Sequence, residues 1–224
     1  MQIFPVLLQT VAIFIAAISV VIGVTAWRRS ALGNRKLEIA EEAICVFRQL
    51  VDAIQEIRSP LSLGGEGSTR QRSDAETERE SEIYDRAYIA FERANRHSEL
   101  FSRVFALRHQ VAFYFGDEIA EAFGEPLRVR HSIFISARAL SRDWLRQGEQ
   151  FRTPGQFDQH LERMHRHEAV FWEGSNEPDE INLALEAAYE QLESECKKML
   201  NPKPTLKGHA KQMYNGMLAY LDFR

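Results

Sequence analysis

The stretch from Phe4 to Trp27 decides the architecture of this chain: it reads FPVLLQTVAIFIAAISVVIGVTAW and contains no ionisable side chain. As a helix, these 24 residues rise ~36 Å, which is enough to cross the ~30 Å hydrocarbon core of a bilayer with some tilt. We therefore predict that residues 1–27 form a transmembrane anchor. The rest of the chain is water-soluble in character.

The charges that flank this helix predict its orientation. Residues 28–36 form a basic juxtamembrane segment with the side chains Arg28, Arg29, Arg35 and Lys36, whereas no basic residue precedes Phe4. A cleaved signal peptide has the opposite order, with basic residues first. Because cationic flanks stay on the cytoplasmic side, we expect a single-pass protein of the cell inner (cytoplasmic) membrane with its N-terminus outside and its C-terminal domain in the cytoplasm. The four charges would also attract anionic lipid head groups, although many cytoplasmic flanks carry as many.

Five small residues lie on one face of the predicted membrane helix, spaced alternately by four and three positions. They are Ala12, Ala16, Ser19, Gly23 and Ala26. Small side chains let two helices approach closely in lipid, where such packing drives association. Two explanations stay open: an interface for a second helix, or the general abundance of small residues in membrane helices.

The same spacing continues beyond the membrane as an apolar seam from Leu37 to Ile54. The continuous register predicts one helix that runs to about Arg58. Its weak point is Gly33-Asn34, because glycine costs about 1 kcal/mol in a helix interior. The apolar stripe is wider than a two-stranded coiled coil requires, which favours a bundle.

Residues 37–200 show helical periodicity and no alternating strand pattern. They predict an all-α, elongated cytoplasmic helical bundle of four to five helices. A flexible loop is expected at residues 59–72, which are rich in Gly and Ser. Further helices are expected at residues 126–148, 153–172 and 178–199, with a short one at 117–123. Residues 201–224 are a C-terminal tail with apolar residues in helical spacing.

The longest predicted helix follows the loop. Ser73-x-x-Glu76 has the spacing of a capping box, and a seam then continues for some forty residues to Phe115. Two polar side chains, His97 and Arg108, interrupt this seam. They are either a buried polar pair or switch, or residues at the edge of the stripe with Arg108 extending its charge to water.

The segment from His160 to Glu168, HLERMHRHE, is the densest polar cluster. On one helix, His160 and His167 stand ~10.5 Å apart along the axis, too far to share one metal ion. Glu162-x-x-His165 has the spacing of di-iron bundles, but those proteins need a second such motif. We therefore interpret the cluster as a solvated helix face with no metal site.

Composition and missing motifs limit the function. The net charge of −4 gives no basic field for nucleic acid, and two cysteines are too few for a disulfide framework. The chain contains no GxxxxGK[ST], HExxH, GxSxG or CxxC motif. We expect no catalytic residue, cofactor, metal or small-molecule substrate. The sequence favours a membrane-anchored, non-enzymatic interaction or scaffold module that binds itself or a protein partner. The alternatives are a signal transducer and an enzyme with a site inside the bundle.

Overall fold

The computed structural model describes residues 3–148, 151 and 153–200 of the 224-residue chain. The described residues are all-α and include no β-strand, which confirms the predicted fold class. The chain divides into two units, residues 1–42 and residues 43–224. The tail at 201–224, predicted to contain helical spacing, lies outside the described residues.

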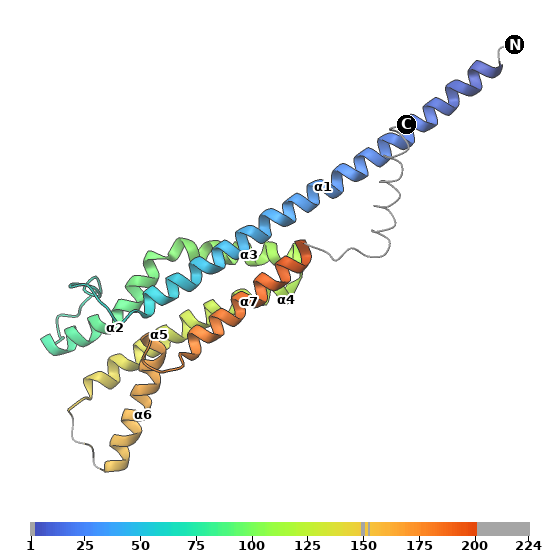
Figure 1. Ribbon diagram of the computed structural model, residues 1–224. Coiled ribbons are helices and arrows are strands. Elements are labelled where there is room, and N and C mark those ends of the chain that lie inside the picture. The colour runs from blue at the N-terminus through green and yellow to red at the C-terminus, as the bar shows by residue number, and fades with distance from the viewer. Residues whose placement is uncertain (1–2, 149–150, 152, 201–224) are drawn as a thin grey trace. The chain divides into compact units, whose positions relative to one another are not determined.

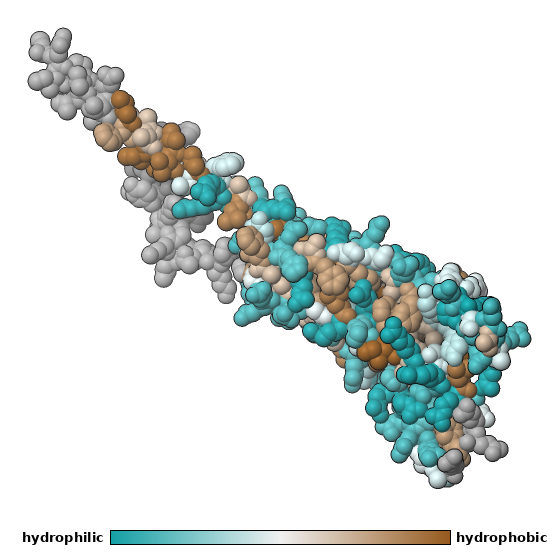
Figure 2. All heavy atoms as spheres, turned by 180° about the vertical axis from the view of Figure 1, so that it is seen from behind, coloured by the Kyte–Doolittle hydropathy of each residue, from teal (hydrophilic) through white to brown (hydrophobic). Residues whose placement is uncertain are grey.

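Helix α1 (Ile3–Arg58) runs through both units without interruption. It continues through Gly33-Asn34 and ends at Arg58, as the seam predicts. Within the first unit, every side chain from Ala12 to Arg35 is exposed. Among the described residues, α1 is the one helix long and apolar enough to cross a membrane. Figure 2 shows apolar side chains along its N-terminal part, whereas polar side chains are prominent over the second unit.

The second unit contains the remaining helices. They are α2 (Glu78–Arg96), α3 (Ser98–Phe115), α4 (Asp117–Ala120), the 3-10 helix η1 (Glu121–Phe123), α5 (Gly124–Leu145), α6 (Pro154–Phe171) and α7 (Glu180–Leu200). Helix α5 packs against α2, α6 and α7 (Figure 1). The C-terminal part of α1 supplies a wide buried stripe that includes Phe47, Leu50 and Ile54. The ring of Phe47 lies 5.6 Å from that of Phe123 and 5.9 Å from that of Tyr189, so α1 is part of this core.

The predicted capping box at Ser73 is wrong. Helix α2 begins at Glu78, with Thr77 as its N-cap. The Thr77 Oγ1 accepts from the backbone N–H of Glu80, and a Glu80 carboxylate oxygen accepts from the N–H of Thr77 at 2.8 Å. Ser73 and Glu76 instead close a single turn before the helix. The carboxylate of Glu76 is paired with Arg70 of the same short segment.

The predicted forty-residue helix is also wrong, because it breaks at His97. This residue has φ −98° and ψ 15° and lies between α2 and α3. Its Nε2 lies 2.9 Å from a carboxylate oxygen of Glu56 on α1. The apolar spacing is the same on both sides of the break and no Gly or Pro marks it, so periodicity does not reveal it.

Candidate functional site

The predicted helix-packing face in the first unit has no partner within the described chain. Its five small residues, Ala12 to Ala26, are all exposed, and a Cβ added at Gly23 would meet nothing within 4 Å. Two hydroxyls of this segment bond to their own helix: Ser19 Oγ, on the face, donates to the carbonyl of Ile15 at 2.8 Å, and Thr25 Oγ1 donates to that of Ile22 at 2.9 Å. Hydroxyls satisfied in this way are compatible with an apolar environment.

The four basic residues of the juxtamembrane segment lie in two pairs on α1, about two turns apart. Arg28, Arg29 and Arg35 are exposed and Lys36 is half-buried. Arg35 pairs with Glu38 at 3.0 Å, with both side chains about half exposed or more. An exposed pair of this kind contributes at most about 1 kcal/mol.

Arg58, a buried residue at the C-terminal end of α1, caps the C-terminus of α6. The side chain of Arg58 has no exposed area. Its Nε donates to the carbonyl of Val170 at 3.0 Å, and its Nη2 donates to the carbonyls of Ala169 at 3.0 Å and Trp172 at 3.2 Å. The last carbonyls of a helix have no partner within it. Arg58 therefore supplies the donors that the C-terminus of α6 lacks.

The same guanidinium joins the start of α7. Arg58 Nη2 lies 2.9 Å from Asp179 Oδ2, and Asp179 Oδ1 accepts from the backbone N–H of Ile181 and Asn182. Burial alone would raise the pKa of Asp179, but the hydrogen bonds from Arg58, Asn182 and the N–H of Gly174 lower it below its ordinary value. Asp179 is thus an ionised N-cap that links α1, α6 and α7.

A second buried arginine, Arg93 of α2, holds the chain that leaves α1. Its Nη1 donates to the carbonyls of Glu56 and Ser59, and its Nη2 donates to the carbonyl of Leu61 and to the carboxylate of Glu66. The hydrogen bond from Arg93 is the largest cause that lowers the pKa of Glu66 to about 2. The segment predicted as a flexible loop is therefore fixed to α2 at these points; its flexibility elsewhere stays a prediction.

The histidine-rich segment of α6 is not the fully solvated face that we expected. His160 is buried, and its Nδ1 lies 3.2 Å from Arg163, which forms a two-pronged pair with Asp143 of α5. His167 is partly buried, with its Nδ1 3.1 Å from Ser136 Oγ. The structure directs these histidines at different residues of α5, and among the described residues it gathers no group of three metal ligands.

His97 and Arg108 lie at the edge of the apolar stripe. His97 bonds to Glu56, as described above. Arg108 Nη2 lies 3.1 Å from a carboxylate oxygen of Glu121, and both side chains are substantially exposed. Each of the two residues is thus paired with a carboxylate, His97 with Glu56 and Arg108 with Glu121.

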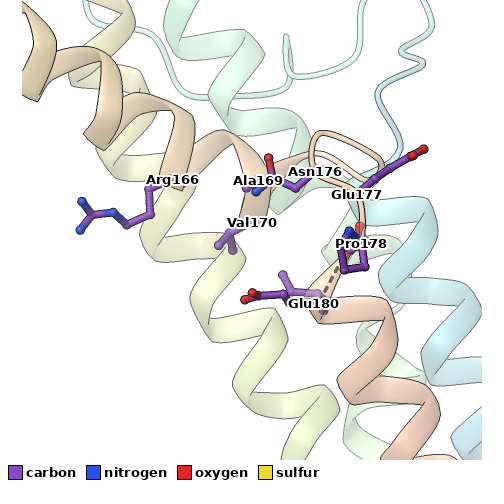
Figure 3. Close-up of a pocket in the computed structure, with 9 residues that line it drawn as sticks. Arg166, Ala169, Val170, Asn176, Glu177, Pro178 and Glu180 are labelled. Atoms are coloured by element: carbon purple, nitrogen blue, oxygen red, sulfur yellow. Dashed lines mark hydrogen bonds between the residues drawn. The ribbon is translucent and has the colours of Figure 1, made fainter.

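A hollow of about 400 Å³ opens where α6 meets α7 (Figure 3). Figure 3 shows the side chain of Arg166 directed away from Pro178 and Glu180, so no cation converges on the acidic groups from that side. Asp179, on the wall of this hollow, has both carboxylate oxygens occupied by Arg58 and backbone N–H groups. This geometry offers a ligand no free, buried polar group.

Comparison with known proteins adds no relative: no family model, no curated protein and no solved structure matches the chain. The functional interpretation therefore depends on the described surfaces alone.

Sequence reasoning missed the two buried arginines. The signal was present for Arg58, which lies four residues after Ile54 and seven after Val51, in register with the apolar stripe.

Proposed function

We propose that this chain is a membrane-anchored, non-enzymatic interaction module. The N-terminal part of α1 spans the cell inner membrane once, and residues 43–200 form a cytoplasmic helical domain that binds a protein partner or a second copy. The observation that carries the proposal is the run of exposed apolar side chains from Ile13 to Trp27, each more than half exposed where its exposure is given. Water would not tolerate so large an apolar surface, whereas a bilayer would cover it.

The proposed orientation rests on the basic segment at residues 28–36. It is tested by fusing reporters after Arg224, one active only in the cytoplasm and one active only after export. We expect the cytoplasmic reporter to be active in membrane fractions. Activity of only the exported reporter would overturn the orientation, and recovery of the full-length chain in the soluble fraction would overturn the anchor itself.

Association through the membrane helix is the second part of the proposal. Gly23 lies on the small-residue face, and Val21 lies off it. In a membrane two-hybrid assay of Phe4–Trp27, Gly23→Ile should separate the two backbones and weaken self-association roughly ten- to a hundredfold, from about 1–3 kcal/mol of overpacking. The matched change Val21→Ile should have little effect. Equal association of the two variants would contradict the interface; no association of the native segment would leave only a different protein as partner.

A specific observation favours a second candidate, a signal transducer. Helix α1 continues without a break from Ile3 to Arg58, so one element joins the proposed membrane segment to the helical domain. Deleting residues 1–27 separates the two candidates: a scaffold's helical domain should still bind its partner, whereas a transducer should lose its response.

A further inference from the structure

A shallow hollow of about 310 Å³ lies between α2 and α5, two helices that pack against each other. Two small, buried residues, Ala87 and Ala137, form its floor. Along one side stand three partly buried rings of α2, at spacings of four and three residues that place them on one helix face. They are Tyr84, Tyr88 and Phe91. The hollow therefore presents aromatic rings around a floor that is too small to fill it.

The rings at this hollow already pack on one another. Phe91 lies 4.6 Å from Phe134 of α5, with an angle of 22° between the ring planes. It also lies 5.7 Å from Tyr88, with an angle of 26°. Much of the surface of Phe91 is thus taken up by other rings. This disfavours a nucleic acid, whose bases stack on free aromatic faces, and favours an apolar side chain that packs against the ring edges and the alanine floor.

Two guanidinium groups flank the stacked rings and lack a carboxylate partner. Arg138 lies 5.7 Å from the ring centroid of Phe91. Arg130 lies 4.3 Å from that of Phe101 and 6.0 Å from that of Phe134. Neither arginine forms an ion pair with another described residue. A ring face attracts a cation by about 0.5–1 kcal/mol at an exposed site, but it does not neutralise the charge.

Arg130 shows this lack most clearly, because it is partly buried. Burial lowers the pKa of Arg130 below its ordinary value, and no carboxylate opposes this effect. Three carboxylates of α2 and of the segment before it are engaged elsewhere. Glu76 and Asp85 pair with Arg70, and Glu92 accepts a hydrogen bond from the N–H of Gly67. A carboxylate from another molecule would therefore complement the charge at this site.

We propose that this hollow binds an acidic segment of a partner protein, with one apolar side chain in the hollow and two carboxylates paired with Arg138 and Arg130. It rests on the proposed function and names the chemistry of the partner. The two arginines are eight residues apart on α5, a rise of ~12 Å, so the segment carries its two acidic residues about that far apart. An anionic bilayer is disfavoured, because a lipid-binding cluster has roughly four to eight basic residues.

Photo-crosslinking of the full-length chain, in membranes of cells that naturally produce it, tests this proposal. A benzophenone amino acid replaces Tyr88, whose ring it resembles, and a control chain carries it at Phe113 of α3, which is 81% exposed. Mass spectrometry then sequences the cross-linked peptides. We expect the Tyr88 probe to join a peptide of another protein that contains an apolar residue and at least two Asp or Glu residues. The Phe113 probe should not join this peptide, although its position is highly exposed.

Variants of the arginines test whether charge recognises the partner. Arg138→Gln together with Arg130→Gln should lower the yield of this product about tenfold. Arg138→Lys keeps the charge and should retain most of the product. Arg142→Gln is the matched control, because Arg142 is an exposed arginine of α5 that does not line the hollow, and it should leave the yield unchanged. Circular dichroism checks that every variant retains the helical domain.

Several results would overturn the proposal. They are a cross-link to a peptide without acidic residues, to a second copy of this chain, or to lipid or RNA, and a yield no greater than that of the Phe113 probe. An equal loss of yield in Arg142→Gln would also contradict it. The proposed function fails by a different result, which is recovery of the full-length chain in the soluble fraction, so the two failures are distinguishable.

Discussion

Replacing the buried Arg58 should strongly destabilise this protein. The variant Arg58→Met keeps the length and the apolar stem but removes the guanidinium. Three backbone carbonyls, at Ala169, Val170 and Trp172, then lose their donors, and Asp179 loses its cation. Breaking a buried charged pair from one side costs 3–5 kcal/mol in general.

The structure narrows this range. Asp179 retains the N–H groups of Gly174, Ile181 and Asn182, so its charge stays partly compensated. We therefore expect a loss of about 3 kcal/mol in the free energy of unfolding, a large share of the 5–15 kcal/mol of an ordinary domain. The stability of Arg58→Lys should lie between that of the native protein and that of Arg58→Met. A lysine ammonium has three donors and cannot replace the planar guanidinium, which bonds to several acceptors at once.

The measurement is equilibrium urea unfolding of the full-length chain in mild detergent, followed by tryptophan fluorescence, to which Trp144 and Trp172 of the helical domain contribute together with Trp27. Arg166→Met is the matched control: it lies on α6, and its pair with Glu162 has both side chains at least 70% exposed, so its loss should be under 1 kcal/mol. If Arg58→Met and Arg166→Met destabilise the protein equally, the argument that Arg58 is a structural link between α1, α6 and α7 is refuted.

Three further predictions concern the segment between α1 and α2. The pKa of Glu66 is lowered to about 2 from 4.5, so its ionised carboxylate contributes about 3 kcal/mol at most to the free energy of unfolding. This contribution is complete above pH 4.5 and is lost as the pH falls toward 2. Glu66→Gln should remove this part of the acid-unfolding profile, and an unchanged profile would contradict the prediction. Thr77→Ala should cost about 1 kcal/mol in urea unfolding and Thr77→Ser a few tenths, whereas equal losses would contradict the capping box. Chymotrypsin should cut first after Leu63, which is 79% exposed, and Arg93→Met should accelerate this cut. A first cut inside α3 would contradict the prediction.

The sequence predicted the helices well where the apolar periodicity agrees with the residues that typically start or end a helix. The seam from Leu37 predicts that α1 ends at Arg58, and Thr153-Pro154 marks the start of α6, with Pro154 at the first position. Both signals are local, since a helix needs one apolar stripe and a suitable first residue. The short helical segment at residues 117–123 was predicted for the same reason, from the glycines on either side.

The failures have a common physical cause, which is that side-chain contacts decide between alternatives that the sequence pattern leaves equal. Thr77-x-x-Glu80 and Ser73-x-x-Glu76 match the same motif, but the carboxylate of Glu76 pairs with Arg70. His97 interrupts a seam whose spacing is unbroken. His160 is buried 3.7 Å from Asp143 of α5, a neighbour that the composition of its own helix does not reveal.

The two buried arginines also constrain how a signal could pass through this protein. Arg93 holds the end of α1 to α2, and Arg58 holds it to α6 and α7, in both cases through charge-assisted hydrogen bonds to backbone carbonyls. Sliding Ala43–Arg58 past its neighbours by one helical turn, ~5.4 Å, would break both sets at once and leave buried donors unpaired, at a cost of several kcal/mol. A transmembrane signal of ordinary strength, about 1–3 kcal/mol, cannot meet that cost. Within residues 43–200, α1 must therefore move together with α2, α6 and α7. This favours a scaffold, whose domain is presented as one body, over a transducer in which α1 slides inside its own bundle.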